Sequence, residues 1–135
     1  MSEELITNQN ISIEKLKELF DSAFLETTID KEGDLVLQGN YKCFVEVPES
    51  KRFVRFASYI IASENASDEA KATYANRINK ELIVVRAYAI DKLFVFDSHI
   101  WLEGGVTPKN IVMGYKFFDK VVPEALRMDE GGVFA

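Results

Sequence analysis

The sequence contains few of the residues on which disulfide, metal and redox chemistry depend. Its 135 residues include one cysteine, one histidine and one tryptophan. A single cysteine excludes a disulfide within the chain, and one cysteine with one histidine cannot by themselves build a zinc site. We therefore expect no disulfide framework, no metal centre and no cofactor.

Excess positive charge and long apolar runs are also missing. Sixteen Lys and Arg stand against 22 Asp and Glu, so the formal net charge is -6. That balance disfavours nonspecific binding to a phosphate backbone, which needs clustered cations. Runs such as 83–85 and 93–96 are far shorter than the roughly 20 residues that cross a bilayer. Since residues 1–10 are acidic and polar, unlike a secretory signal, we expect a cytoplasmic protein without nucleic-acid or membrane partners.

The composition of the chain is typical of a single packed domain. Apolar residues make up 47% of it and aromatic residues 12%. A chain of this length can bury enough surface to fold without disulfides or metals. We expect a single domain over residues 1–135, with residues 1–11 and 129–135 flexible.

Three segments have the period and the start signals of helices. Ser12 precedes an apolar stripe that runs to Phe24, and this first helix is expected to end near residue 25. Ser67 or Ser63 can cap a second helix that reaches residue 81. The third begins with Thr107 at its N-cap and a proline at its first position, and the further Pro123 is expected to kink or weaken it.

The remaining segments alternate like strands. Residues 35–37, 41–47 and 52–61 precede the second helix, and residues 82–90 and 92–102 follow it, joined by a tight turn at Asp91 and Lys92. A short strand near Thr27 is uncertain. The pattern predicts an α+β fold, an antiparallel sheet with helices in the order α-β-β-β-α-β-β-α.

Two side chains of the last predicted strand could serve proton transfer. Alternation places Asp97 and His99 on one side of it, whereas Ser98 points the other way. A partly exposed histidine at a strand end is the simpler interpretation, and Cys43 has the pattern of a buried structural thiol. We assign no catalytic residue. The alternative is a small-molecule sensor or enzyme with a pocket between sheet and helices near Asp97, His99 and Trp101.

Two loops resemble ligand sites only loosely. Asp30, Glu32 and Asp34 alternate around a glycine but do not match the order of a calcium loop, so we interpret them as a solvated turn. Gly104 and Gly105 precede a helix without a phosphate-loop motif, and they more simply turn the chain from strand to helix.

The last helix carries a basic stripe opposite its apolar face. Lys109, Lys116 and Lys120 fall in one narrow angular band, and Met113 and Phe117 lie beside it. A basic stripe bordered by apolar groups on an acidic protein can dock an acidic partner helix or another copy of the chain. The alternative is an ordinary solvated helix face. These five residues are the candidate protein-binding site.

Three segments resemble the YbjN family of bacterial proteins, and the likeness extends from about residue 13 to residue 127. The most specific segment is LEGGVTPKN before the last helix; the others are short. They cover residues 102–110, 29–35 and 75–79.

The resemblance implies a regulator of bacterial sensory transduction whose fold is similar to that of type III secretion chaperones. Such chaperones are small, acidic, cytoplasmic and dimeric, and they bind extended segments of other proteins. The family brings no catalytic residues, so none are transferred to this chain. We accordingly expect a non-enzymatic protein-binding regulator that forms a homodimer.

Overall fold

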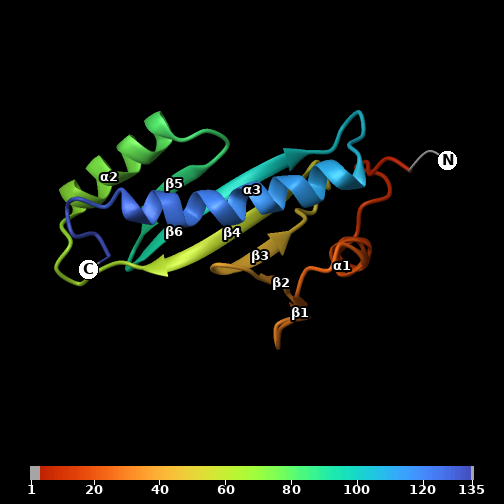
Figure 1. Cartoon of the computed structure of the whole chain (residues 1–135), viewed down its shortest axis with the longest axis horizontal. Helices are drawn as coiled ribbons and strands as arrows, with labels where there is room; N and C mark the ends of the chain where they lie inside the picture. Colours follow the sequence, from red (N-terminus) through yellow and green to blue (C-terminus); the bar gives the residue numbers. More distant parts are fainter. Residues whose placement is uncertain (1–3, 135) are drawn as a thin grey trace.

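The computed structural model describes residues 4–134, which form three helices and one six-stranded sheet (Figure 1). All neighbouring strands are antiparallel, in the order β1-β2-β3-β4-β6-β5. The predicted α+β class with an antiparallel sheet is therefore confirmed. The helices are α1 (Ile13–Ser22), α2 (Asp68–Glu81) and α3 (Pro108–Arg127). The strands are β1 (Thr27–Ile29), β2 (Leu35–Gln38), β3 (Lys42–Glu46), β4 (Phe53–Ile61), β5 (Arg86–Ile90) and β6 (Leu93–Trp101).

The order of elements differs from the prediction by one strand. Four strands, not three, precede α2, because the uncertain segment near Thr27 forms β1 and pairs with β2 from Thr27 opposite Leu37 to Ile29 opposite Leu35. β5 also begins at Arg86, four residues later than the alternation of residues 82–90 indicated.

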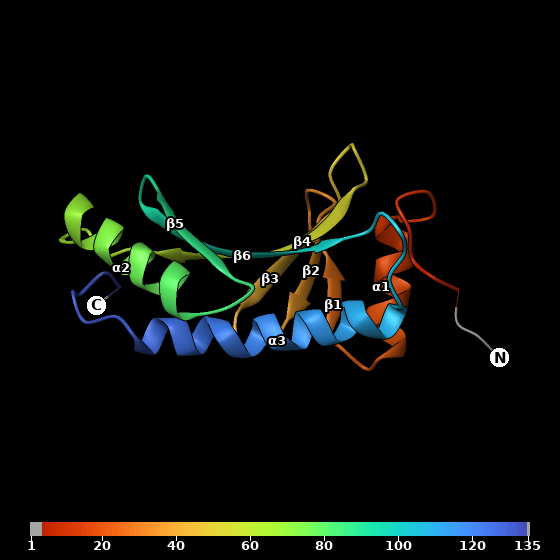
Figure 2. The same ribbon diagram turned by 90° about the horizontal axis from the view of Figure 1, so that it is seen from above.

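The helices lie on one side of the sheet. In Figure 2, α2 and α3 extend along one face and α1 lies at the end of the sheet near β1, while no helix of residues 4–134 lies over the opposite face. We call this opposite surface the open face. Along β6, side chains such as Phe96 and Ile100 point into the helix-covered core, so their neighbours Asp97, His99 and Trp101 point to the open face.

The helix starts follow the sequence closely. The Ser67 hydroxyl accepts the backbone N–H of Ala70 at 3.0 Å, and the Thr107 hydroxyl accepts that of Asn110 at 3.0 Å, so both predicted caps are confirmed. The helix ends are less predictable. α1 stops at Ser22 rather than near residue 25, and α3 continues through Pro123 to Arg127.

Aromatic packing holds α1 and α3 on the sheet. The fully buried Phe56 of β4 contacts Phe20 of α1 and Phe118 of α3, with ring centroids 6.3 Å apart in each pair. α3 approaches β6 closely at Gly114, where a Cβ atom would lie 2.7 Å from Cδ1 of Ile100. A larger residue there would push the helix away from the sheet, so this glycine allows the short distance between α3 and β6.

The segments 1–11 and 129–135, which the sequence predicts to be flexible, are described from residue 4 and up to residue 134, and residues 1–3 and 135 lie outside the described part; both described parts pack on the rest of the chain. Ile6 is 3% exposed and forms a β-bridge with Val106. At the other end Val133 is fully buried, and its carbonyl accepts the backbone N–H of Ser63 at 2.6 Å. Each terminus thus contributes an apolar side chain to the core.

Within residues 4–134 no helix combines the length and the apolar character needed to cross a membrane. The longest, α3, carries several charged side chains along its exposed side, among them Lys116 and Lys120.

Candidate functional site

The outward side of α3 presents the five residues that the sequence singled out. Met113 is 50% exposed and Phe117 is 41% exposed, and all three lysines of the set are exposed as well. We call Lys109, Met113, Lys116, Phe117 and Lys120 the α3 face. The buried stripe of the helix lies opposite and packs on the sheet, so helical geometry leaves the α3 face turned to solvent.

Phe24 adjoins the α3 face, and its position was predicted wrongly. The sequence pattern placed it on the buried stripe of the first helix, but α1 ends before it and its side chain is 96% exposed. Its backbone has φ 63°, a left-handed conformation that favours glycine after a helix. The ring does not pack in the core, and the left-handed turn would be formed more easily by glycine. Neither the core nor the turn therefore explains why an exposed phenylalanine stands at this position. The exposure of Phe24 follows from the end of α1 at Ser22. The sequence did not reveal this end, because the apolar period of the helix continues to Phe24.

A hollow of about 500 Å³ connects Phe24 to the α3 face. Lys116 and Lys120 line one side of it, and Asp119 and Asn40 lie within it. The Asp119 carboxylate accepts hydrogen bonds from the backbone N–H of Asn40 at 2.8 Å and from its side-chain amide at 3.2 Å. Asp119 is thus already engaged, while the exposed Glu26 also lines the hollow, together with the two exposed lysines and Phe24.

A different kind of site lies at the centre of the open face. Asp97 is fully buried there although no helix covers it, and two arginines bind its carboxylate. Arg86 donates from Nε to Oδ1 at 3.0 Å and from Nη2 to Oδ2 at 2.7 Å, and Arg55 donates from Nε to Oδ2 at 2.9 Å. We call Asp97, Arg55, Arg86, Glu46 and Tyr88 the Asp97 cluster.

The Asp97 cluster is electrically balanced. Arg55 also pairs with Glu46 at 2.6 Å and donates to the Tyr88 hydroxyl at 2.9 Å. Burial by itself would raise the pKa of Asp97, but hydrogen bonds from Arg86 and Arg55 outweigh it and hold the pKa below its ordinary value. Asp97 is therefore ionised at neutral pH and held by its partners, an arrangement suited to structure rather than to proton transfer.

His99 and Cys43 are the other two side chains that could take part in chemistry, and the fold determines the surroundings of both. His99 shares the open face with Asp97, as the alternation predicted, and its ring packs edge-on against Phe53 with centroids 5.1 Å apart. Burial lowers the pKa of His99, which favours its neutral form. Cys43 is 1% exposed, as predicted, and burial raises the pKa of its thiol well above the ordinary value.

The alternative pocket between sheet and helices is not where the sequence placed it. Asp97, His99 and Trp101 alternate with the core residues Phe96 and Ile100 along β6, so they point to the open face. Asp97 and His99 do line a hollow of about 360 Å³, together with Asn79 of α2 and the segment that connects α2 to β5, but Trp101 is not part of it. The error arose because alternation says which residues share a face, not which face the helices cover.

The three acidic residues of the turn between β1 and β2 lie close together. Carboxylate oxygens of Asp30, Glu32 and Asp34 all lie within 4.8 Å of one another. Oδ1 of Asp30 accepts the backbone N–H of Glu32 at 3.0 Å and that of Asp34 at 2.8 Å, so it stabilises the turn itself. These contacts are those of the solvated turn that the sequence indicated.

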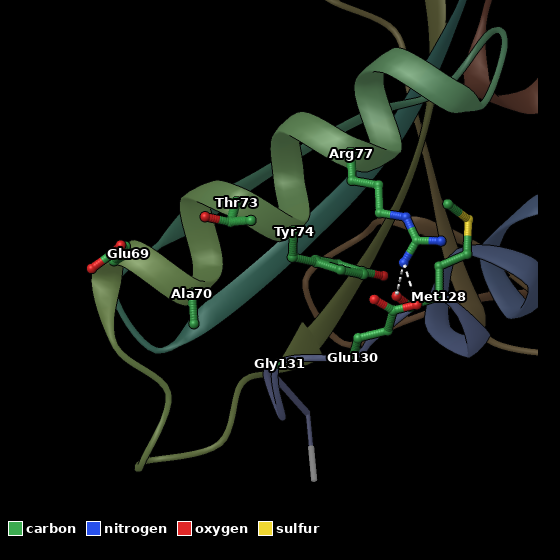
Figure 3. Close-up of a pocket in the computed structure, with 8 residues that line it drawn as sticks. All are labelled: Glu69, Ala70, Thr73, Tyr74, Arg77, Met128, Glu130 and Gly131. Atoms are coloured by element: carbon green, nitrogen blue, oxygen red, sulfur yellow. Dashed lines mark hydrogen bonds and ion pairs between the residues drawn. The ribbon is translucent and has the colours of Figure 1, made fainter.

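A groove that the sequence did not indicate separates α2 from the segment after α3 (Figure 3). Its volume is about 320 Å³, and the buried ring of Tyr74 extends across it with its hydroxyl donating to the carbonyl of Ala125 at 2.6 Å. Arg77 closes one end by contacting the Met128 carbonyl at 3.0 Å and the Glu130 carboxylate at 3.1 Å. Only the folded chain brings these segments together.

These features define a small α+β protein with one helix-covered and one open sheet face, and with a basic–apolar helix surface. The chain belongs to the YbjN family, whose model, described as "Putative bacterial sensory transduction regulator", matches residues 12–113. The fold is similar to the crystal structure of YbjN from E. coli, described there as a "putative transcription regulator", with a TM-score of 0.74. The two chains are 13% identical, and the similarity covers 89% of this chain and 90% of the other. No curated protein matches the chain.

Proposed function

We propose that this protein is a non-enzymatic, cytoplasmic regulator that acts by binding other proteins, and that it works as a homodimer. The observation that carries the proposal is the exposed pairing of apolar and basic groups on α3. Met113 and Phe117 expose about half of their side chains between lysines, and the fully exposed ring of Phe24 lies next to Lys116 and Lys120. Clustered exposed apolar groups with a polar rim are typical of interaction surfaces.

The non-enzymatic part of the proposal is supported by how the reactive side chains are held. The Asp97 carboxylate is occupied by Arg55 and Arg86 and cannot readily exchange a proton near neutral pH. The Cys43 thiol is buried and protonated, which removes its nucleophilic form. The Asp97 carboxylate is thus held in ion pairs, and the Cys43 thiol is part of the buried core.

The partner's chemistry follows from the charges of the α3 face. The chain as a whole carries a net charge of -6, yet the α3 face contributes three lysines. A helix with an apolar stripe flanked by glutamate or aspartate matches this surface, because its stripe can cover Met113 and Phe117 while its acids meet the lysines. We therefore propose an acidic amphipathic helix of a partner protein as the ligand.

A defined peptide tests this proposal. An 18-residue peptide of leucine and glutamate, with leucines at helical spacing and a fluorescent label, is titrated with the full chain in an anisotropy assay. We expect binding that weakens as salt is raised, and no binding of a peptide of equal composition with its leucines out of helical spacing. Phe117→Ser and Lys116→Glu should each weaken binding at least about tenfold.

Lys31→Glu is the matched control for the charge change, because Lys31 is exposed on the turn between β1 and β2. It makes the same change in net charge away from the α3 face, so it should leave binding almost unaltered at moderate salt. Equal losses in Lys31→Glu and Lys116→Glu, or equal binding of the two peptides, would show that only net charge matters and would reject the proposed site.

A further inference from the structure

One end of the open face carries a row of exposed aliphatic side chains. Ile61 of β4 pairs with Leu93 of β6, and Leu93 pairs with Ile90 of β5, so the three side chains stand side by side. They are 75%, 37% and 49% exposed, respectively. No helix crosses this face in Figure 2. Three adjacent aliphatic groups in water are costly, which suggests that something covers them.

The other end of the same strands is also apolar. Phe53 at the start of β4 pairs with Trp101 at the end of β6, and their rings stack with centroids 6.4 Å apart. Trp101 is 54% exposed. The open face therefore has an apolar group at each end of the β4–β6 pair, with the Asp97 cluster between them.

The open face has Arg86 on one flank and three carboxylates on the other, although Lys42 shares the acidic flank and its Nζ lies 4.9 Å from the centroid of the Phe44 ring. On β5, the side chain of Arg86 is 58% exposed although it binds Asp97. On the far flank a hollow of about 430 Å³ is lined by three carboxylates and two aromatic rings. We call this the acidic hollow; its residues are Glu32, Asp34, Phe44, Glu46 and Tyr59.

The sheet register relates these two flanks by symmetry. One row across the sheet joins Phe44 of β3, Ala57 of β4, Asp97 of β6 and Arg86 of β5 as successive pairs. β3 and β5 thus lie at equal distances on either side of the line between β4 and β6. Rotation by 180° about an axis parallel to that line, placed above the open face, brings Arg86 of one chain over Phe44 of another.

We propose that the open face binds the open face of a second copy of this chain, about a two-fold axis parallel to β4 and β6 that passes between them. Arg86 of each copy then enters the acidic hollow of the other, next to Glu46 and the ring of Tyr59. The same rotation brings Ile61 over the other copy's Leu93, and Phe53 over its Trp101. The inference rests on the proposed homodimer and names its surface; it does not involve the α3 face.

The physical case for a second copy is that apolar groups of β4 and β6 meet apolar groups and that Arg86 meets carboxylates. Ile61 covers Leu93 and Phe53 covers Trp101. Arg86 reaches a hollow with the ring of Tyr59 and three carboxylates, a favourable setting for guanidinium. One of these carboxylates, that of Glu46, also pairs with Arg55 of its own chain. Stacked sheets lie about 10 Å apart with strand directions within about 30°, so long side chains such as Arg55 and Arg86 can fill the space between them. A single patch repeated on both partners is the arrangement that two-fold symmetry requires.

The test measures the mass of the full chain in solution by light scattering across a concentration series. We expect a dimer. Ile61→Asp should raise the dimer dissociation constant at least about tenfold, because the row would then bury two carboxylates. Ile83→Asp, an equally exposed isoleucine in the connection between α2 and β5, should leave it unchanged.

A second pair of variants tests the charge contact. Glu32→Lys with Asp34→Lys replaces two acids of the hollow by bases, and it should weaken the dimer and reduce its sensitivity to salt. Glu18→Lys with Glu64→Lys makes the same charge change at exposed positions on α1 and before α2, and should have little effect. All four residues are exposed, so circular dichroism should show an unchanged fold.

Cross-linking tests the axis. The protein with Ile61→Cys is mixed with the protein with Leu93→Cys and treated with a short bismaleimide; mixed 61–93 products should dominate, since the native Cys43 is buried. A monomeric wild type would overturn both this inference and the homodimer. A dimer that is indifferent to Ile61→Asp and to the Glu32 and Asp34 changes would overturn this surface alone. Neither result depends on peptide binding by the α3 face.

Discussion

Asn40 completes the hydrogen bonding of helix α3. Its side-chain amide donates to the backbone carbonyl of Asp119 at 3.0 Å. Asp119 lies four residues before Pro123, and a proline has no N–H to give to that carbonyl, so the turn after β2 supplies the missing donor. Gly39 makes this possible, because a Cβ atom there would overlap the Asp119 carboxylate. The helix continues through Pro123 to Arg127, where the sequence predicted a kinked or weakened helix, and the donor that replaces the missing N–H comes from 79 residues away in the chain.

We predict that Asn40→Ala lowers the free energy of unfolding by about 1 kcal/mol, since it removes the amide donor from an otherwise unpaired carbonyl. Urea denaturation measures it. In a Pro123→Ala background the new N–H of residue 123 can bond the Asp119 carbonyl, so the same change should cost clearly less. An equal loss of unfolding free energy in both backgrounds would mean that Asn40 does not replace the hydrogen-bond donor that Pro123 lacks.

We predict that Asp97→Asn lowers the free energy of unfolding at pH 7 by roughly 3 kcal/mol, because it leaves Arg55, whose side chain is only 14% exposed, without its buried counter-charge. The folded-state pKa of Asp97 lies below its unfolded value, so the ionised carboxylate stabilises the fold above about pH 4 and this contribution is lost as the pH falls further. Urea titrations from pH 7 to pH 2.5 should show the two proteins converging in acid. A constant difference across that range would exclude the ionised state of Asp97 as the cause.

Asn79 protects the free edge of the sheet. Its side-chain amide donates to the carbonyl of Ala87 at 3.0 Å, and its side-chain oxygen accepts the N–H of Ala87 at 2.8 Å, as a neighbouring strand would. We predict that Asn79→Ala lowers the free energy of unfolding by about 1–3 kcal/mol and promotes aggregation on mild heating, because the edge of β5 is then unpaired. Light scattering during a thermal ramp measures the second effect. Asn76→Ala, exposed on the same helix, is the control, and equal aggregation of both variants would count against edge protection.

Asp129 fastens the end of the described chain. Its two carboxylate oxygens accept the backbone N–H groups of Val133 at 2.9 Å and of Phe134 at 3.0 Å. We predict that Asp129→Ala costs about 1–3 kcal/mol of unfolding free energy and speeds amide hydrogen exchange at these two positions. Glu130→Ala, next in the chain and strongly exposed, should leave that exchange slow. Fast exchange of both amides in the wild type would show that the segment is not held as the structure places it.

Local signals in the sequence were reliable where the structure they describe is local. Ser67 and Thr107 cap their helices because a hydroxyl three residues before an N–H is correctly placed by the chain itself. The alternation of β6 correctly put Asp97 and His99 on one face for the same reason. The exposure of Met113 and Phe117 also followed from helical period alone.

Features that depend on contacts between distant segments were not predicted, or were predicted wrongly. Phe24 fits the apolar period of α1, but the helix ends before it and the ring is left in solvent. The apolar residues at both termini were expected to lie in flexible segments, yet Ile6 and Val133 find partners that only folding brings near. Arg55 reaches Asp97 from β4, 42 residues away, and no spacing rule connects the two, whereas the predicted hairpin turn at residues 91–92 already places Arg86 opposite Asp97.

The sequence by itself determined the composition limits, the α+β class, the antiparallel strands and the basic–apolar side of the last helix, because all of these depend on residue type and on periods of two or 3.6 residues. Tertiary structure decided which sheet face the helices cover, and hence that Asp97, His99 and Trp101 lie on the open one. It also decided that Asn40 offsets Pro123 and that Asn79 closes the sheet edge. These are contacts between segments whose separation along the chain carries no information about their distance in space, so only the packed core could establish them.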